Sequence, residues 1–132
     1  MSSGKRYKVL VFGNPMLTDD SLPLRIMPRL AKLFPRIEFK EFDPNENLEK
    51  EGKELNILDS VEGLRKATII TDIDSIMTRR IYSMHDFDLG YSLKLLKKLH
   101  YIDSVRIFGV PMRIGEKEAV EQVSALLISS LS

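Results

Sequence analysis

Short runs of strand-forming residues alternate along this chain with stretches of helical periodicity, and this alternation limits the fold more than any other feature. Strands are predicted at residues 7–12, 67–71 and 104–110, because each run is short, nearly all apolar and rich in β-branched or aromatic side chains. Residues 37–41 alternate between apolar and charged side chains, as expected of a half-buried edge strand. Nearly all-apolar strands are typical of parallel sheets, and helices normally cover both faces of such sheets.

Amphipathic helices are predicted between and after these strands. The first begins at Ser21, a hydroxyl residue suited to a helix N-terminus, with Pro23 in the first turn, and its apolar residues recur up to residue 33. Leucines repeat at helical spacing over residues 88–99, and residues 116–131 form a closing amphipathic helix. The intervening residues 45–56 are predicted to be a loop or a short surface helix, and 61–66 one or two helical turns.

Strands that alternate with helices in this way favour an α/β fold. We expect a three-layer α/β/α sandwich around a mainly parallel, twisted sheet of four to five strands. The 132 residues suit a single domain, residues 1–132, because no linker or internal repeat divides the chain and domains of about 100–150 residues are common.

The composition excludes several classes of function. The 20 basic and 19 acidic residues give a net charge of +1, so nothing indicates binding to nucleic acid. The absence of cysteine excludes disulfides, thiolate zinc sites, iron–sulfur clusters and cysteine nucleophiles. The apolar runs are far shorter than the roughly 18 residues that a membrane span needs, and the polar N-terminus leads directly into a strand. A cytoplasmic protein without membrane contact is expected.

Two loops of this chain are expected to carry the functional residues. Ligands of mainly parallel sheets bind outside the carboxyl ends of the strands, and the loops after the first and third predicted strands should both lie there. The first loop contains Asp19 and Asp20, and the other runs from Asp72 to His85. One imidazole and two carboxylates suit a divalent metal without filling its coordination shell. Structural alternatives are a helix-capping role for one of the paired aspartates, solvation for Asp72 and a structural role for His85.

Other sites with similar residues fit less well. A dinucleotide-binding loop needs three glycines after the first strand, and here Gly13 stands alone. A response-regulator receiver domain has paired acids directly after its first strand and a lysine after its last. Here Asp19 and Asp20 come seven and eight residues after Phe12, and no lysine directly follows Val110. A Gly-x-Ser-x-Gly nucleophile motif is also absent from the sequence.

Three motifs, in this order, resemble those of the hydrogenase maturation proteases. Residues 13–20 read Gly-Asn-x-x-x-Thr-Asp-Asp, residues 69–72 form an apolar strand that ends in Asp72, and residues 83–89 contain a Ser-x-His stretch that opens a helix. The strand that includes residues 108–110 and the C-terminal helix also fit the last elements of that family. The resemblance therefore covers almost the whole chain.

This resemblance implies a short, divergent endopeptidase that removes the C-terminal extension of a nickel-iron hydrogenase large-subunit precursor after nickel insertion. It also implies that Asp20, Asp72 and His85 are the catalytic and metal-ligating residues. The nickel is then supplied by the substrate, and other divalent metals can substitute for it. The precursor is the expected partner, and the protease is expected to be a monomer. The alternative is a non-catalytic module that uses the same metal site to hold a nickel-loaded partner.

One departure from the family pattern falls in the loop after the second predicted strand. The family usually has a glycine–threonine turn there, which is associated with substrate recognition, whereas residues 42–45 of this chain read Phe-Asp-Pro-Asn. We therefore expect this loop to contact its precursor in a different way from the glycine–threonine turn of the family.

Overall fold

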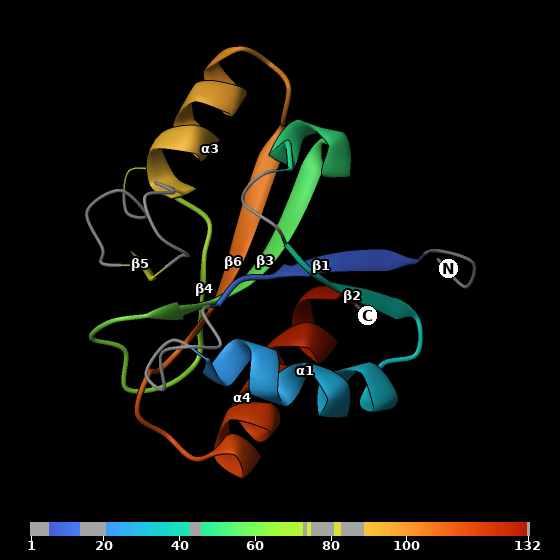
Figure 1. The fold of residues 1–132 in the computed structure, drawn as a ribbon, viewed down its shortest axis with the longest axis vertical. Helices are drawn as coiled ribbons and strands as arrows, with labels where there is room; N and C mark the ends of the chain where they lie inside the picture. Colours follow the sequence, from blue (N-terminus) through green and yellow to red (C-terminus); the bar gives the residue numbers. More distant parts are fainter. Residues whose placement is uncertain are drawn as a thin grey trace.

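The computed structural model describes residues 6–13, 21–42, 46–72, 74, 81–82 and 89–131. These residues form a six-stranded sheet with helices on both of its faces (Figure 1). The strands are β1 (Tyr7–Val11), β2 (Ile37–Glu41), β3 (Glu54–Val61), β4 (Thr68–Ile70), β5 (Ile81–Tyr82) and β6 (Ser104–Val110). The helices are α1 (Leu22–Leu33), the 3-10 helix η2 (Leu48–Glu51), α3 (Leu89–Lys98) and α4 (Glu116–Leu131).

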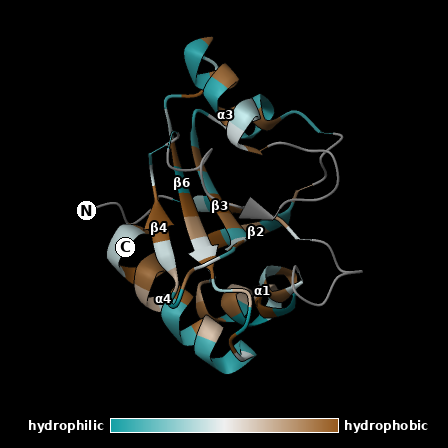
Figure 2. Cartoon of the chain, turned by 90° about the vertical axis from the view of Figure 1, so that its left-hand side faces the viewer, coloured by the Kyte–Doolittle hydropathy of each residue, from teal (hydrophilic) through white to brown (hydrophobic). Residues whose placement is uncertain are grey.

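The sheet is mainly parallel. Its strands stand in the order β2-β1-β3-β6-β4, and the neighbours β2, β1, β3 and β6 are parallel to one another. β4 is antiparallel to β6, and the short β5 is antiparallel to the end of β3. α1 and α4 cover one face of the sheet, and α3 covers the other (Figures 1 and 2). The predicted α/β sandwich is thus confirmed, with five strands along the sheet and β5 attached to β3 alone.

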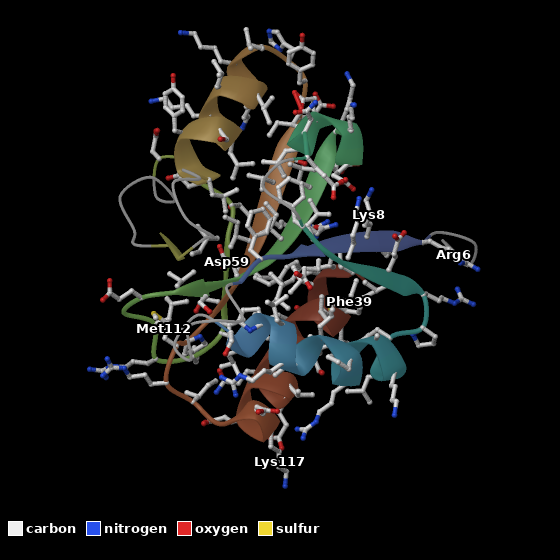
Figure 3. All side chains as sticks on the ribbon, viewed as in Figure 1. Arg6, Lys8, Phe39, Asp59, Met112 and Lys117 are labelled. Atoms are coloured by element: carbon white, nitrogen blue, oxygen red, sulfur yellow. The ribbon has the colours of Figure 1, made fainter. Side chains whose placement is uncertain are left out.

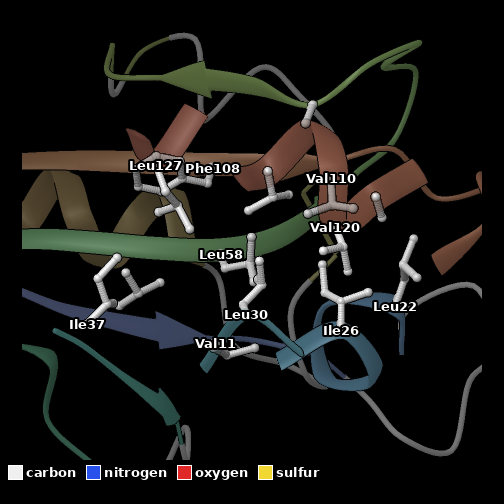
Figure 4. Close-up of a cluster of buried hydrophobic side chains, with 14 of the residues drawn as sticks. Val11, Leu22, Ile26, Leu30, Ile37, Leu58, Phe108, Val110, Val120 and Leu127 are labelled. Atoms are coloured by element: carbon white, nitrogen blue, oxygen red, sulfur yellow. The ribbon is translucent and has the colours of Figure 1, made fainter. Parts of the chain in front are cut away.

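Successive residues of the central strands pack into two separate cores, because the side chains of a strand point alternately to opposite faces. Leu58 and Phe108 lie in the core that α1 and α4 cover (Figure 4). Ile57 and Ile107, one position earlier in each strand, lie in the core beneath α3. All four side chains are buried, so β3 and β6 form the centre of the molecule.

α1 begins where the sequence predicts, but the Ser21 hydroxyl caps no backbone N–H and instead accepts a hydrogen bond from Arg25 Nε at 3.0 Å. The Arg25 N–H donates to the Ser21 carbonyl at 3.0 Å, which closes the first helical turn. Pro23 lies in that turn, where its missing N–H leaves no hydrogen bond unmade. Three side chains of α1 are fully buried, those of Leu22, Ile26 and Leu30. Among the described residues, no helix is both long and apolar enough to cross a membrane.

The sequence prediction misses the central strand β3. It expects a loop or a short surface helix at 45–56, and η2 is such a helix, but β3 already begins at Glu54. It expects helical turns at 61–66, where the structure has the last residue of β3 followed by a turn and a bend. The prediction fails because Asn56, Asp59 and Ser60 interrupt the apolar run, although all three are buried.

The strand predicted at 67–71 also differs from expectation. It forms as β4, but at an edge of the sheet and antiparallel to its neighbour, rather than as a buried parallel strand. Thr68 and Ile69 are only half-buried. A run of apolar residues indicates that a segment is a strand, but not in which direction it runs. The remaining predicted elements are confirmed to within one residue, at 7–12, 37–41, 88–99, 104–110 and 116–131.

Candidate functional site

The structure describes one of the three residues predicted to form the site. Asp20 and His85 lie outside the described residues. Asp72 is exposed after the end of β4, and its Oδ1 accepts a hydrogen bond from the Asp74 N–H at 3.0 Å. Such a local turn is a common role for aspartate. Within the part of the chain that is described, no three histidine, aspartate or glutamate side chains lie close enough to hold a metal ion together.

Asp72 does not lie at the sheet edge where the sequence predicts it. The carboxyl ends of the parallel strands are marked by Ser60 of β3, which pairs with Val110 of β6. β4 runs the opposite way, and its Ile70 pairs with Ile107, so Asp72 lies still farther toward the amino ends of the parallel strands. The expectation that Asp72 lies at the same edge as the loop after β1 is therefore wrong, because β4 is antiparallel.

A different aspartate, Asp59, lies at the carboxyl end of the central strand β3. It pairs with Gly109 of β6, and on the other side the Phe12 N–H donates to the Leu58 carbonyl at 2.9 Å. The strands β1 and β6 therefore flank this residue. Asp59 is 0% exposed, and its Oδ1 accepts a hydrogen bond from the Ser60 N–H at 2.8 Å. Figure 3 shows Asp59 in the middle of the molecule.

The surroundings of Asp59 are largely apolar. It shares a face of β3 with Ile57 and Val61, because residues two apart in a strand point the same way, and that face belongs to the core beneath α3. On the β1 side, the rings of Phe12 and Phe42 are stacked, with centroids 4.9 Å apart. Burial of an ionised carboxylate in such surroundings is unfavourable unless it is hydrogen-bonded or binds a cation. An aspartate at this position is therefore a candidate functional residue.

Gly109 of β6 pairs with Asp59 and lets β6 lie close to residues 61–68 of the same chain. A Cβ atom at this position would lie 2.9 Å from Val61 Cγ2, 3.0 Å from Leu64 Cδ1 and 3.3 Å from the Thr68 carbonyl oxygen. Protein interiors have no room for such short carbon–carbon contacts without local movement. The space between Gly109 and these three residues is therefore closely packed, and this packing depends on a residue without a side chain.

The chain segments that carry Asp20 and His85 both continue from residues next to Asp59. β1 passes beside Asp59 and leads into residues 14–20, which include Asp20. Tyr82 of β5 pairs with the residue that follows Asp59, and His85 comes three residues after Tyr82. Asp59 thus stands between Phe12 and Tyr82, the described residues after which these two segments continue.

The sequence prediction overlooks Asp59, although a signal for it is present. Ile57-Leu58-Asp59 is an apolar strand segment that ends in an aspartate, a pattern similar to that of residues 69–72. The polar residues Asn56 and Ser60 on either side conceal the strand, because they break the apolar run that marks buried strands.

A second group of charged residues lies around η2, beside β1 and β2. Glu51 of η2, whose side chain is 6% exposed, accepts hydrogen bonds from Lys8 Nζ at 2.6 Å and Lys40 Nζ at 2.8 Å. Burial alone would raise the pKa of Glu51, but these hydrogen bonds outweigh it and lower the pKa. Hydrogen bonds to Glu51 and Glu46 raise the pKa of Lys40. This group joins η2 to β1 and β2, next to a polar cavity of about 280 Å³, and does not include Asp59.

Comparison with known proteins gives independent information about the fold. No protein-family model matches the sequence, and no curated protein matches it either. The solution structure of the endopeptidase HycI from Escherichia coli is similar over 93% of this chain and 90% of that one, with a TM-score of 0.60 and 25% identity. The crystal structure of a NiFe hydrogenase maturation protease HycI from Thermococcus kodakarensis is similar over 94% of this chain and 92% of that one, with a TM-score of 0.56 and 19% identity.

These similarities extend along nearly the whole chain. The Thermococcus protein, at 19% identity, supports the fold alone, while the Escherichia coli protein adds a likeness in sequence. The motifs at residues 13–20 and 83–89 point in the same direction. Together these observations make the chain similar to peptidases of the hydrogenase maturation protease family.

Proposed function

We propose that this protein is an endopeptidase that removes the C-terminal extension of a nickel-iron hydrogenase large-subunit precursor after nickel has been inserted. One similar protein is an endopeptidase and the other is a NiFe hydrogenase maturation protease, which supports this class of reaction and substrate. The observation that carries the proposal is the fully buried Asp59 at the carboxyl end of β3.

We assign contact with the substrate's nickel to Asp20, Asp59 and His85, with Asp59 in the place that the sequence prediction gives to Asp72. Asp59 is supported by its burial and by its position between the strands that lead toward the other two residues. Asp72 is disfavoured by its exposure and by its turn hydrogen bond from the Asp74 N–H.

This set of donors suits a metal that arrives with the substrate. Imidazole nitrogen and carboxylate oxygen both bind divalent nickel, and three such ligands leave coordination positions for those that the precursor itself supplies. The chain has no cysteine, so it offers no thiolate to retain nickel by itself. The open coordination positions are suited to transient contact with substrate nickel, and only a precursor that has received its nickel offers this contact.

Asp59 contributes a carboxylate whose direction is restrained. Its Oδ1 accepts the Ser60 N–H, and the pairing of β3 with β6 holds its backbone. A restrained ligand loses little conformational freedom when substrate binds. During cleavage, a water molecule loses a proton as it attacks the scissile carbonyl, and a nearby carboxylate is a suitable base. Asp20 and Asp59 are the two carboxylates that the proposal offers for this step.

The proposal is tested by processing in vitro. Purified protein is mixed with nickel-loaded large-subunit precursor, and mass spectrometry follows the loss of the C-terminal extension. Nickel-free precursor is the control. The expected result is cleavage at one site in the loaded precursor and none in the nickel-free form. If the loaded precursor forms a complex but stays intact, the peptidase proposal fails, and the alternative of a non-catalytic module that holds a nickel-loaded partner replaces it.

A further inference from the structure

α3 carries apolar residues on two opposite sides. Leu89 and Leu93 point into the core beneath the helix. Tyr91, Leu95 and Leu99 follow one another at intervals of four residues along the other side and just past the helix end, and are 59%, 42% and 54% exposed. We call these three residues the α3 stripe. The outer side of a helix that only covers a sheet is typically polar, and a contiguous apolar stripe there favours a contact surface.

A groove runs beside the α3 stripe. It is a cavity of about 250 Å³ between α3 and residues 46–49, the segment that leads into η2. Its main walls are formed by Tyr91, Leu95 and Leu96 on one side and by Glu46, Leu48 and Glu49 on the other. Tyr91 and Leu95 belong to both the stripe and the groove, so the two form one continuous surface.

The two borders of this surface carry opposite charges. Successive residues of a helix are about 100° apart around its axis, so Lys94 and Lys98 lie on the side of the α3 stripe away from the groove. Both are exposed, and no ion pair within the described residues involves either of them. The groove side carries Glu49 and Glu46, of which Glu46 already accepts Lys40 Nζ at 3.2 Å.

This pattern fits an amphipathic segment of another protein. Helical segments dock in such grooves through apolar side chains that are one turn apart, and complementary charges fix their orientation. The matching segment carries an apolar stripe with acidic side chains on the border that meets Lys94 and Lys98. On its other border it carries a basic side chain opposite Glu49.

The position of α3 connects this surface with the proposed site. Leu89, the first residue of α3, comes four residues after His85. The helix then runs beside the sheet from the side of β5 toward the start of β6 (Figure 1). We infer that the α3 stripe and its groove dock the body of the large-subunit precursor through such an amphipathic segment, while the C-terminal extension is bound near Asp59. This inference rests on the proposed function.

Leu95→Glu tests the apolar part of the surface. It places a charge in the centre of the α3 stripe and leaves the buried side of α3 unchanged. The expected result is a rise of about tenfold or more in the KM for nickel-loaded precursor, with kcat within about twofold, because docking stabilises bound substrate and transition state equally. Ile128→Glu is the matched control, since Ile128 of α4 is 58% exposed, and it should keep the wild-type KM.

The double variant Lys94→Glu/Lys98→Glu tests the charged border. It should also raise the KM, and the rise should be largest at low ionic strength, because salt screens exposed charges. Lys117→Glu, at an exposed position of α4 (Figure 3), is the control. A rise of equal size in the control would show a general effect of net charge and would overturn the assignment of this border.

The outcomes separate the docking inference from the proposed function. If the wild-type protein neither binds nor cleaves the loaded precursor, the proposed function fails. If the wild-type protein cleaves it and Leu95→Glu keeps the wild-type KM, the docking inference alone is overturned. Light scattering tests whether a second copy of this chain, rather than the precursor, binds the α3 stripe. A dimeric wild type, a monomeric Leu95→Glu variant and equal KM values would mean that the α3 stripe joins two copies of this chain, which also overturns the inference.

Discussion

Asp59 and Asp72 both follow apolar strand segments, yet they lie toward opposite ends of the same sheet. Asp59 pairs with Gly109 near the end of β6, whereas Asp72 follows Ile70, which pairs with Ile107 and runs on toward the start of β6. Asp59 is fully buried, and Asp72 is exposed. The two carboxylates are therefore expected to contribute very differently to function.

Asp59→Asn is expected to slow cleavage of nickel-loaded precursor by about 100-fold or more. The amide keeps the shape of the side chain but loses the negative charge that suits it to contact the metal, and even residues that only support metal ligands give losses of 10–100-fold. Stability should be unchanged or slightly higher, because a buried charge is removed. Initial cleavage rates and urea unfolding measure the two effects.

Asp72→Asn is the matched control for this substitution. It makes the same chemical change in an exposed side chain and should leave the cleavage rate within about twofold, as expected for a surface position. Full activity of Asp59→Asn, or an equal loss in both variants, contradicts the choice of Asp59 over Asp72.

Asp20→Ala and His85→Ala are each expected to abolish processing. Their free energy of unfolding should stay within about 1 kcal/mol of wild type, as expected for groups that serve function rather than packing. Cleavage assays and thermal unfolding test both points. His100→Asn is the control for the histidine, because His100 is exposed with a φ of 64°, a conformation that asparagine tolerates. A large loss of stability in His85→Ala would instead mark that residue as structural.

Gly109→Ala is expected to destabilise the protein by about 1–3 kcal/mol. Its Cβ would lie 2.9 Å from Val61 Cγ2 and 3.0 Å from Leu64 Cδ1, so closely packed neighbours must move. Gly115→Ala is the control, because a Cβ there meets nothing within 4 Å, and it should be neutral or slightly stabilising. The free energies of unfolding in urea check the difference, and equal values for the two variants would disprove the packing argument.

Glu51→Gln is expected to weaken the acid dependence of stability. The pKa of Glu51 is lowered in the folded protein from its ordinary value of 4.5, so the ionised carboxylate stabilises the fold above that pH. The stabilisation is lost as the pH falls through the lowered pKa. Since Lys8 and Lys40 are 32% and 35% exposed, solvent screens the pairs, and the contribution at pH 7 is about 1 kcal/mol or less.

Urea unfolding between pH 2 and pH 7, in roughly unit steps, measures this effect. Wild type should lose more stability than Glu51→Gln as the pH falls below 4.5, the ordinary pKa of this group. Glu54→Gln, which alters an exposed carboxylate of β3, should retain the wild-type profile. Parallel profiles for wild type and Glu51→Gln would show that the lysine contacts do not stabilise the folded state.

Much of the fold could be predicted from local patterns. The strands β1 and β6 match their predicted bounds to within one residue, because a short, nearly all-apolar run is typical of a strand that is buried on both faces. The helix α4 has the expected bounds, because the period of its apolar residues reports which side is buried. The start of α1 at Ser21 and Pro23 is likewise a local property, set by backbone geometry within one turn. These features need no knowledge of the neighbouring elements.

β3 could not be recognised in this way. Asn56, Asp59 and Ser60 are polar residue types that normally mark loops, and their burial follows from the strands β1 and β6 on either side. Those neighbours come from distant parts of the chain. A polar site residue on a central strand is thus hard to predict from sequence. Its side chain is polar because it serves function, and the same polarity interrupts the apolar run that marks a buried strand.

The sequence by itself determined the α/β class, the bounds of most elements and the motifs around Asp20 and His85 that resemble a peptidase family. Only the tertiary structure decided that Asp59, and not Asp72, stands at the carboxyl edge of the sheet. The reason is that the direction of a strand depends on hydrogen bonds to a distant partner. β4 pairs with β6 in the antiparallel sense, and this direction places Asp72 away from that edge.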